Sequence, residues 1–267
     1  MKLLAGIALF AALAGGASFY AGVYDISATD QHLAPTYWLL DTGMRRSVRQ
    51  RAAEIAVPDL GHAGQIERGL ALFREHCVQC HGAPGVAPQP FALGMTPAPA
   101  NMVHTAREWA PAEVFWVVKE GIKMTGMPAW KYRLGDEDIW AIVSFMRELP
   151  KLSPADYRAL KAPRAMPAKP AALEPSDAER GRKAINQYAC VTCHRIPGIV
   201  GANAPVGPPL ERVSTRGLIA GVLPNTPENM VKWLRQPQTV NPKSAMPDLG
   251  VSERDAWDIA AYLATLK

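Results

Sequence analysis

Two short motifs in this 267-residue chain combine thiols with an imidazole. The four cysteines form two Cys-x-x-Cys pairs, each followed directly by a histidine: Cys77, Cys80 and His81, then Cys190, Cys193 and His194. At this spacing two thiols can bond to the vinyl groups of one haem, and the adjacent histidine is held against the iron. Two complete copies therefore predict two covalently bound haem c groups, with His81 and His194 as iron ligands.

Paired cysteines have two other common uses. They hold structural zinc, and in exported proteins they form disulfides. Neither use requires a histidine directly after each pair. We therefore favour haem attachment.

The second iron ligand is expected later in each half of the chain. Methionine sulfur is a soft ligand that suits haem iron and raises its reduction potential. Met127 and Met246 each precede a proline in a loop that contains glycine, proline or serine, before the closing helix. We predict that Met127 completes the ligand set of His81, and that Met246 completes that of His194.

Some alternatives to these ligands remain. Met124 lies in the same loop as Met127 and is its chief competitor. Four further histidines have no counterpart at a matching place in the other half: His32, His62, His76 and His104. Met146 and Met230 fall on predicted helices, where methionine usually fills a core.

Each ligand histidine needs an acceptor for its other ring N–H, and a backbone carbonyl is a usual choice. The Gly-Pro-Pro-Leu turn at residues 207–210 offers the carbonyl of Pro208 to His194. The first half has no such turn. There the Thr-Pro-Ala-Pro segment at residues 96–99 either supplies the acceptor for His81 or only stiffens a loop.

The surroundings of the two motifs repeat. Gly69 and Phe73 precede the first motif, and Gly181 and Ile185 precede the second with the same separation. A separation of four residues places both members of a pair on one face of a helix. The sequence thus predicts a helix that leads into each motif.

Further helices are predicted towards the end of each half. Asp-x-Trp-x-Ile occurs at Asp138 and again at Asp255, and we expect Ser252 to cap the second of these closing helices. Prolines precede two middle helices, at residues 112–120 and 228–235. The predicted fold is mainly α.

The amino terminus carries an uncharged stretch from Leu3 to Val23, which is long enough to span a membrane. A cleaved signal peptide is the rival interpretation. Residues 35–54 follow with an aromatic and aliphatic run and then four arginines, which is typical of a segment at a membrane surface or a docking face. A solvated connecting helix is the simpler alternative.

These features predict five segments along the chain: 1–24, a membrane anchor or signal; 25–63, a connecting or interfacial segment; 64–150, a first haem domain; 151–175, a proline-rich linker that we expect to be extended and semi-rigid; and 176–267, a second haem domain.

The formal net charge of +5 is small for a chain of this length. The propionates of two haems would offset most of it. The basic residues form no stripe interleaved with aromatic residues, so we expect no nucleic-acid partner. A modest basic surface can still steer an acidic protein partner.

Both halves resemble the class I cytochrome c family. The resemblance covers residues 64–150 and 176–267 and rests on the haem motifs, the Met-Pro loops, the turn at residues 207–210 and the closing helices. Two departures occur in the second half: Ile185 replaces the usual phenylalanine, and one extra residue precedes Cys190. The resemblance implies a small helical fold around each haem, His/Met ligation and electron transfer.

The resemblance also implies a place in a bacterial respiratory chain, at the inner membrane with the haem domains facing the periplasm. We expect an electron carrier, not an enzyme with a small-molecule substrate. It would connect a quinol-oxidising complex or dehydrogenase to a terminal oxidase. The alternative is a permanently bound haem subunit of an oxidase or dehydrogenase complex. A dihaem peroxidase is less favoured, because it needs one iron with an open position.

Overall fold

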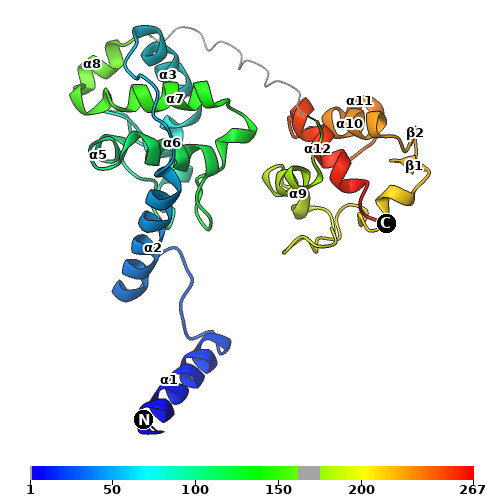
Figure 1. Ribbon diagram of the computed structural model, residues 1–267, viewed down its shortest axis with the longest axis horizontal. Coiled ribbons are helices and arrows are strands. Elements are labelled where there is room, and N and C mark those ends of the chain that lie inside the picture. Colours follow the sequence, from blue (N-terminus) through cyan, green and yellow to red (C-terminus); the bar gives the residue numbers. More distant parts are fainter. Residues whose placement is uncertain (1, 162–174) are drawn as a thin grey trace.

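The computed structural model describes residues 2–161 and 175–267, which form two helical domains and an amino-terminal extension (Figure 1). The first domain contains six helices and three short 3-10 turns: α3 (Ala63–His76), α4 (Val78–His81), η1 (Pro90–Ala92), α5 (Met102–Glu108), α6 (Pro111–Glu120), η2 (Trp130–Tyr132), α7 (Asp136–Met146), η3 (Leu149–Lys151) and α8 (Pro154–Ala159).

The second domain contains four helices, two 3-10 turns and one small hairpin: α9 (Ala178–Gln187), η4 (Cys190–Thr192), η5 (Val213–Thr215), β1 (Leu218–Ile219), β2 (Leu223–Pro224), α10 (Pro227–Arg235), α11 (Pro237–Val240) and α12 (Glu253–Leu263). The two strands pair antiparallel, with Ile219 opposite Leu223. The described residues are thus mainly helical, as the sequence predicts.

The same helix crossing organises both domains. In the first domain α3 packs on α7, and in the second α9 packs on α12. A Cβ atom at Gly69 would lie 1.9 Å from the carbonyl oxygen of Ala141, and one at Gly181 would lie 1.9 Å from that of Asp258. Because backbone atoms cannot move aside, both crossings require glycine.

Apolar side chains fill the space on either side of each crossing. Phe73 is fully buried against Phe145, with 5.5 Å between the ring centroids. In the second domain Ile185 and Ile259 are buried equally well. The smaller side chain at residue 185 therefore still contributes to a closed core, and burial of these apolar surfaces stabilises both domains.

The predicted middle helices are confirmed, although each begins one residue earlier. α6 begins at Pro111 and α10 at Pro227, because proline fits the first position of a helix, where no backbone N–H is needed. Ser252 caps α12 by accepting a hydrogen bond from the backbone N–H of Asp255, as predicted. α7 starts after Gly135 without a side-chain cap.

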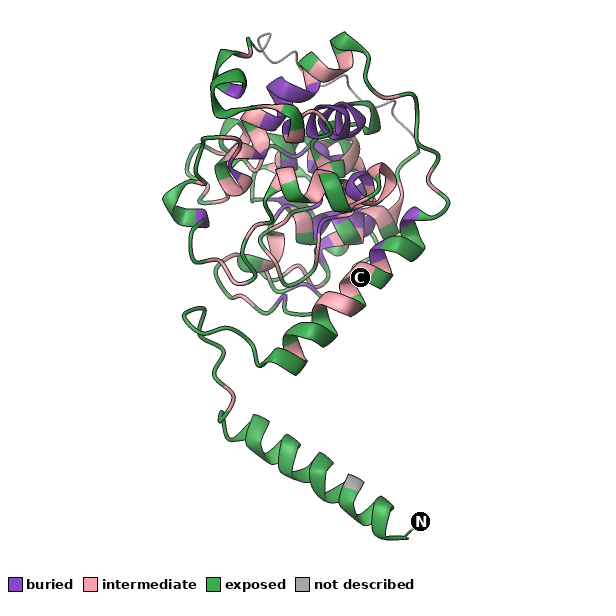
Figure 2. Cartoon of the chain, turned by 90° about the vertical axis from the view of Figure 1, so that its left-hand side faces the viewer, coloured by how far each residue is buried: buried purple, intermediate pink, exposed green. Residues whose placement is uncertain are grey.

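The extension contains two helices. α1 (Lys2–Tyr20) is long and apolar enough to cross a membrane, and its described side chains are exposed (Figure 2). An amino-terminal signal sequence would have the same length and composition. α2 (Ala34–Ala52) packs on α6 through its carboxyl-terminal half, where Val48 and Ala52 are buried. Its amino-terminal half carries four consecutive exposed side chains, Tyr37 to Leu40.

The prediction of an extended linker is wrong for its first part. Residues 154–159 form α8, and Tyr157 is buried in the core of the first domain. Arg74 donates hydrogen bonds to the carbonyl oxygens of Tyr157 and Leu160, at 3.0 and 3.1 Å. Ser153 caps this helix. The remainder of the predicted linker, residues 162–174, lies outside the described residues.

Candidate haem sites

The first motif lies where α3 ends. Cys77 directly follows α3, and α4 carries Cys80 and His81. Burial raises the pKa of the Cys77 thiol to about 12, so this thiol is neutral. A neutral thiol suits a buried position that becomes an uncharged thioether.

The imidazole of His81 is oriented by one backbone carbonyl. Its Nδ1 lies 2.7 Å from the carbonyl oxygen of Ala100, which can only accept, so Nδ1 carries the hydrogen. Burial lowers the pKa of His81, although this hydrogen bond opposes the shift. The neutral ring keeps the lone pair of Nε2 for a metal. Ala100 directly follows the segment 96–99, so of the two alternatives for that segment, the one in which it supplies the acceptor is wrong.

The second motif is held in the same way. His194 Nδ1 lies 2.7 Å from the carbonyl oxygen of Pro208, which confirms the predicted acceptor. A Cβ atom at Gly207 would lie 2.5 Å from Cε1 of His194, so the ring occupies space that only glycine leaves. Burial raises the pKa of Cys190 to about 11, and this thiol is neutral as well.

The extra residue of the second domain changes how the helix meets the motif. α3 runs up to Cys77, whereas α9 ends at Gln187. Ala189 then adopts a left-handed conformation with φ of 54°, before η4 begins at Cys190. The insertion is therefore absorbed in one strained residue outside the helix, and α9 keeps its register against α12.

The two Met-Pro loops share a turn. The backbone N–H of Met127 donates to Oγ1 of Thr125, and the backbone N–H of Met246 donates to Oγ of Ser244, both at 3.1 Å. Met127 and Met246 are half-buried and pack against the cores of their domains. The sequence carries a signal for this turn, a hydroxyl residue two positions before each methionine, which the prediction did not use.

Met124 differs from both of these methionines. Its side chain is 97% exposed, and its backbone is left-handed with φ of 59°. The geometry favours Met127 over Met124.

The other histidines have partners away from the two motifs. His32 is hydrogen-bonded to Tyr24, and the ring of His76 packs against that of Trp130 at a tilt of 42°. Two more lie beside carboxylates: His62 near Asp59 and His104 near Glu108. The four cysteines are free thiols. Within residues 2–161 and 175–267, no three His, Cys, Asp or Glu side chains converge as a metal site.

The residues present fit haem. Each domain combines a pair of thiols, an imidazole fixed by a carbonyl, and a half-buried methionine loop. A surface pocket beside His81 is lined by Asn101, Met102 and Leu149 among others. When bound, haem supplies the one-electron redox chemistry, while the chain supplies ligands, burial and docking surfaces.

Comparison with known proteins agrees with this geometry. Residues 64–146 match the family model described as cytochrome C oxidase, cbb3-type, subunit III, and residues 178–267 match that described as cytochrome c. Cytochrome c oxidase subunit 2 of Alkalihalophilus pseudofirmus is 34% identical over 97 residues, which cover 35% of this chain. The match covers only 28% of that relative. No solved structure matches.

Both halves of the chain are thus similar to haem-binding domains, which confirms the resemblance that the sequence shows. Two cytochrome c domains in tandem support a haem c electron-transfer protein. The chain thus carries two tandem domains of the class I cytochrome c type, at residues 64–146 and 178–267.

Proposed function

We propose that each domain holds one covalently bound haem between a histidine and a methionine. Cys77 and Cys80 attach the first haem, with His81 and Met127 on its iron. In the second domain the corresponding residues are Cys190, Cys193, His194 and Met246. The observation that carries this proposal is the parallel geometry: matching histidine-to-carbonyl distances and matching hydroxyl-to-methionine turns.

Replacement of each methionine tests the ligand sets. Met127→Ala should remove the long-wavelength absorption of iron–methionine ligation from the first haem, and Met246→Ala should remove it from the second. The potential of the affected haem should fall, within the roughly 0.8 V range that axial ligands span. Met124→Ala is the matched control in the same loop and should change neither property. A spectrum that changes with Met124→Ala but not with Met127→Ala would reverse the assignment.

A haem iron with protein ligands at both axial positions has no open site for a small-molecule substrate. Two such haems suit an electron carrier. We place this carrier in a bacterial respiratory chain, where it receives electrons from a quinol-oxidising complex or dehydrogenase and passes them to a terminal oxidase. The oxidase names of the matching family model and relative support the acceptor. The apolar helix α1 would anchor the chain in the inner membrane with both haem domains in the periplasm.

A second candidate is a haem subunit bound permanently to a terminal oxidase. The first family model and the relative are both described as oxidase subunits. The exposed side chains Tyr37 to Leu40 at the start of α2 offer an apolar surface next to the proposed anchor. Extraction in mild detergent distinguishes the two: a permanent subunit co-purifies with oxidase haem and copper, whereas a carrier elutes alone.

A further inference from the structure

Side chains of the two domains contact each other in the described part of the chain. On the first domain the contacting residues include Tyr132, at the end of η2, and Arg133. Arg133 donates a hydrogen bond to the carbonyl oxygen of Gln187 at 3.3 Å, and its guanidinium lies 5.7 Å from the ring centroid of Tyr188. The rings of Tyr132 and Tyr188 meet edge-on, with centroids 6.3 Å apart. Tyr188 is thus the centre of the contact on the second domain.

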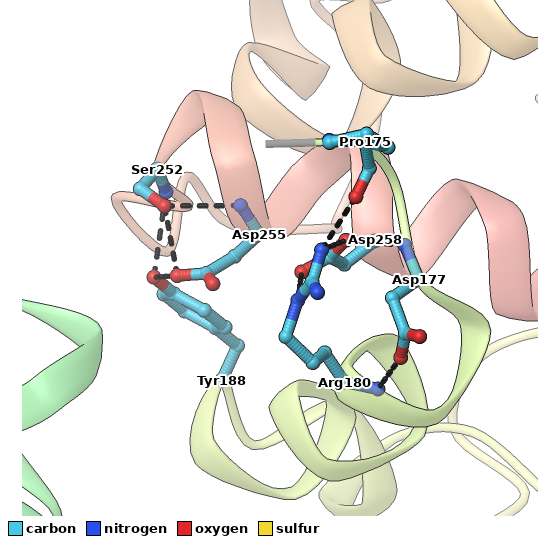
Figure 3. Close-up of polar contacts among 7 residues, drawn as sticks. All are labelled: Pro175, Asp177, Arg180, Tyr188, Ser252, Asp255 and Asp258. Carbon is cyan, nitrogen blue, oxygen red and sulfur yellow. Dashed lines mark hydrogen bonds and ion pairs between the residues drawn. The ribbon is translucent and has the colours of Figure 1, made fainter. Parts of the chain in front are cut away.

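Tyr188 is anchored in its own domain by a hydrogen bond. Its hydroxyl donates to Oδ2 of Asp255 at 2.7 Å (Figure 3), and with the contacts of the first domain included the residue is only 3% exposed. The carbonyl oxygen of Tyr132 lies 3.2 Å from the same hydroxyl. One hydroxyl hydrogen cannot serve both acceptors fully, and the charged carboxylate is the stronger one. Asp255 therefore fixes the ring that the first domain contacts.

Asp255 can accept a hydrogen bond from Tyr188 because the arginine at the helix crossing of the second domain pairs with a different aspartate. In the Asp-x-Trp-x-Ile repeat, Asp255 corresponds to Asp138, and Asp138 forms an ion pair with Arg68. In the second domain Arg180, which like Arg68 directly precedes the crossing glycine, pairs with Asp258 instead. Asp255 then accepts the hydroxyl hydrogen of Tyr188 (Figure 3).

The extra residue before Cys190 also contributes to the position of Tyr188. Tyr188 and Ala189 lie between the end of α9 and the haem motif, and the left-handed backbone of Ala189 separates Tyr188 from Cys190. On the other side of the contact, Tyr132 follows the loop of Met127 by a single short turn. The contact therefore joins the methionine loop of the first domain to the cysteine segment of the second.

We propose that Tyr188 is a docking residue, and that the Tyr132–Arg133 turn binds it to fix the separation of the two haem groups. The contact is small, but both partners belong to one chain. A short linker gives an effective concentration on the order of millimolar, so a weak contact can be well populated. This inference rests on the proposed function, because a fixed separation matters only if both domains carry haem.

Pulsed electron paramagnetic resonance on the oxidised full-length holoprotein in detergent tests the proposal, because both ferric haems are paramagnetic. The wild-type protein should give one narrow haem-to-haem distance distribution. Arg133→Ala, which changes an exposed residue, should broaden it, and the further substitution Tyr188→Phe should abolish the narrow component. Arg147→Ala, at another exposed arginine of the first domain, is the matched control and should leave the distribution narrow.

Haem content and absorption spectra separate the possible failures. Two haems per chain with unchanged ligand bands, together with a broad wild-type distribution, would overturn the docking proposal and leave the proposed function intact. A narrow distribution that survives both substitutions would also overturn it. Fewer than two haems per chain would contradict the proposed function, and the docking proposal with it.

Discussion

The two domains share one crossing of helices but stabilise it with different ion pairs. Gly69 and Gly181 allow equally close approach of the crossing helices. Arg68 pairs with Asp138 in the first turn of α7, whereas Arg180 makes two hydrogen bonds to Asp258 near the middle of α12. Ala141 occupies the position in the first domain that corresponds to Asp258.

This difference separates what a haem domain needs from what one domain has added. The glycine crossing, the carbonyl acceptor of the histidine and the turn at the methionine occur twice. The position of the buried aspartate and the length of the segment before the cysteines differ between the two domains. In the second domain these two variable features together create the environment of Tyr188.

The largest effect is expected at the crossing glycines. Gly69→Ala and Gly181→Ala each place a methyl group against a backbone carbonyl oxygen, so each should lower the free energy of unfolding of its own domain by about 3 kcal/mol or more. Chemical denaturation followed by haem absorption measures the loss. Gly64→Ala in the same helix as Gly69 is the control, since a Cβ atom there meets nothing within 4 Å. Equal stability of Gly64→Ala and Gly69→Ala would disprove the crossing.

Replacement of the buried aspartates should give the next largest loss in the free energy of unfolding. The aspartates concerned, Asp138 and Asp258, do not occupy equivalent positions in the two domains. Asp138→Asn and Asp258→Asn each remove the buried negative charge that pairs with a partly exposed arginine, and each should destabilise one domain by about 2 kcal/mol. Asp255→Asn, at the position equivalent to Asp138, should cost only about 1 kcal/mol because it weakens hydrogen bonds from two neutral hydroxyl groups, those of Tyr188 and Ser252, and breaks no ion pair with an arginine. Amide hydrogen exchange resolves the two domains. A larger loss for Asp255→Asn than for Asp258→Asn would contradict the comparison.

A smaller difference concerns the start of the closing helices. Ser252→Ala removes the cap of α12 and should lower the free energy of unfolding of the second domain by about 1 kcal/mol. Gly135 occupies the equivalent position of α7, where no side chain caps the helix. Gly135→Ser should stabilise the first domain by a few tenths of a kcal/mol, roughly. Thermal unfolding of both variants checks this, and a stabilising Ser252→Ala would refute it.

The last prediction is a pH dependence that is absent at neutral pH and confined to alkaline solution. Burial and the hydrogen bond to Asp255 raise the pKa of Tyr188 to about 12, compared with about 10 in an unfolded chain. The unfolded chain therefore loses this proton first, and the free energy of unfolding should fall as the pH rises from about 10 to about 12. Far-ultraviolet circular dichroism follows the loss. Tyr188→Phe should show a weaker decline, and an identical decline would count against the raised pKa.

Local sequence patterns predicted the features that depend on neighbouring residues. The prolines before α6 and α10, and Ser252 before α12, are start signals that act within one turn of helix. The carbonyl of Pro208 was predictable because its Gly-Pro-Pro-Leu turn lies in the chain as one unit. Helix α8 carries comparable signals, Ser153 before Pro154 and Asp156 in the first turn, but the many prolines after it suggested an extended linker.

Features that depend on distant residues could not be predicted in the same way. Ala100 accepts from His81 across an intervening loop that has no recognisable turn. The pairing of Arg180 with Asp258, and not with Asp255, depends on how α9 lies across α12. The contact of Tyr132 with Tyr188 joins two domains, and no periodicity within either segment indicates it.

The central claim is that a methionine is the second axial ligand of the haem iron in both domains. Carbon monoxide binding to the reduced holoprotein tests it most directly, because the gas binds only an iron with an available position. The account predicts no binding by the wild-type protein, binding at one haem in Met127→Ala or Met246→Ala, and binding at both haems in the double variant. Binding by the wild-type protein would contradict the account and favour an enzyme with an open iron.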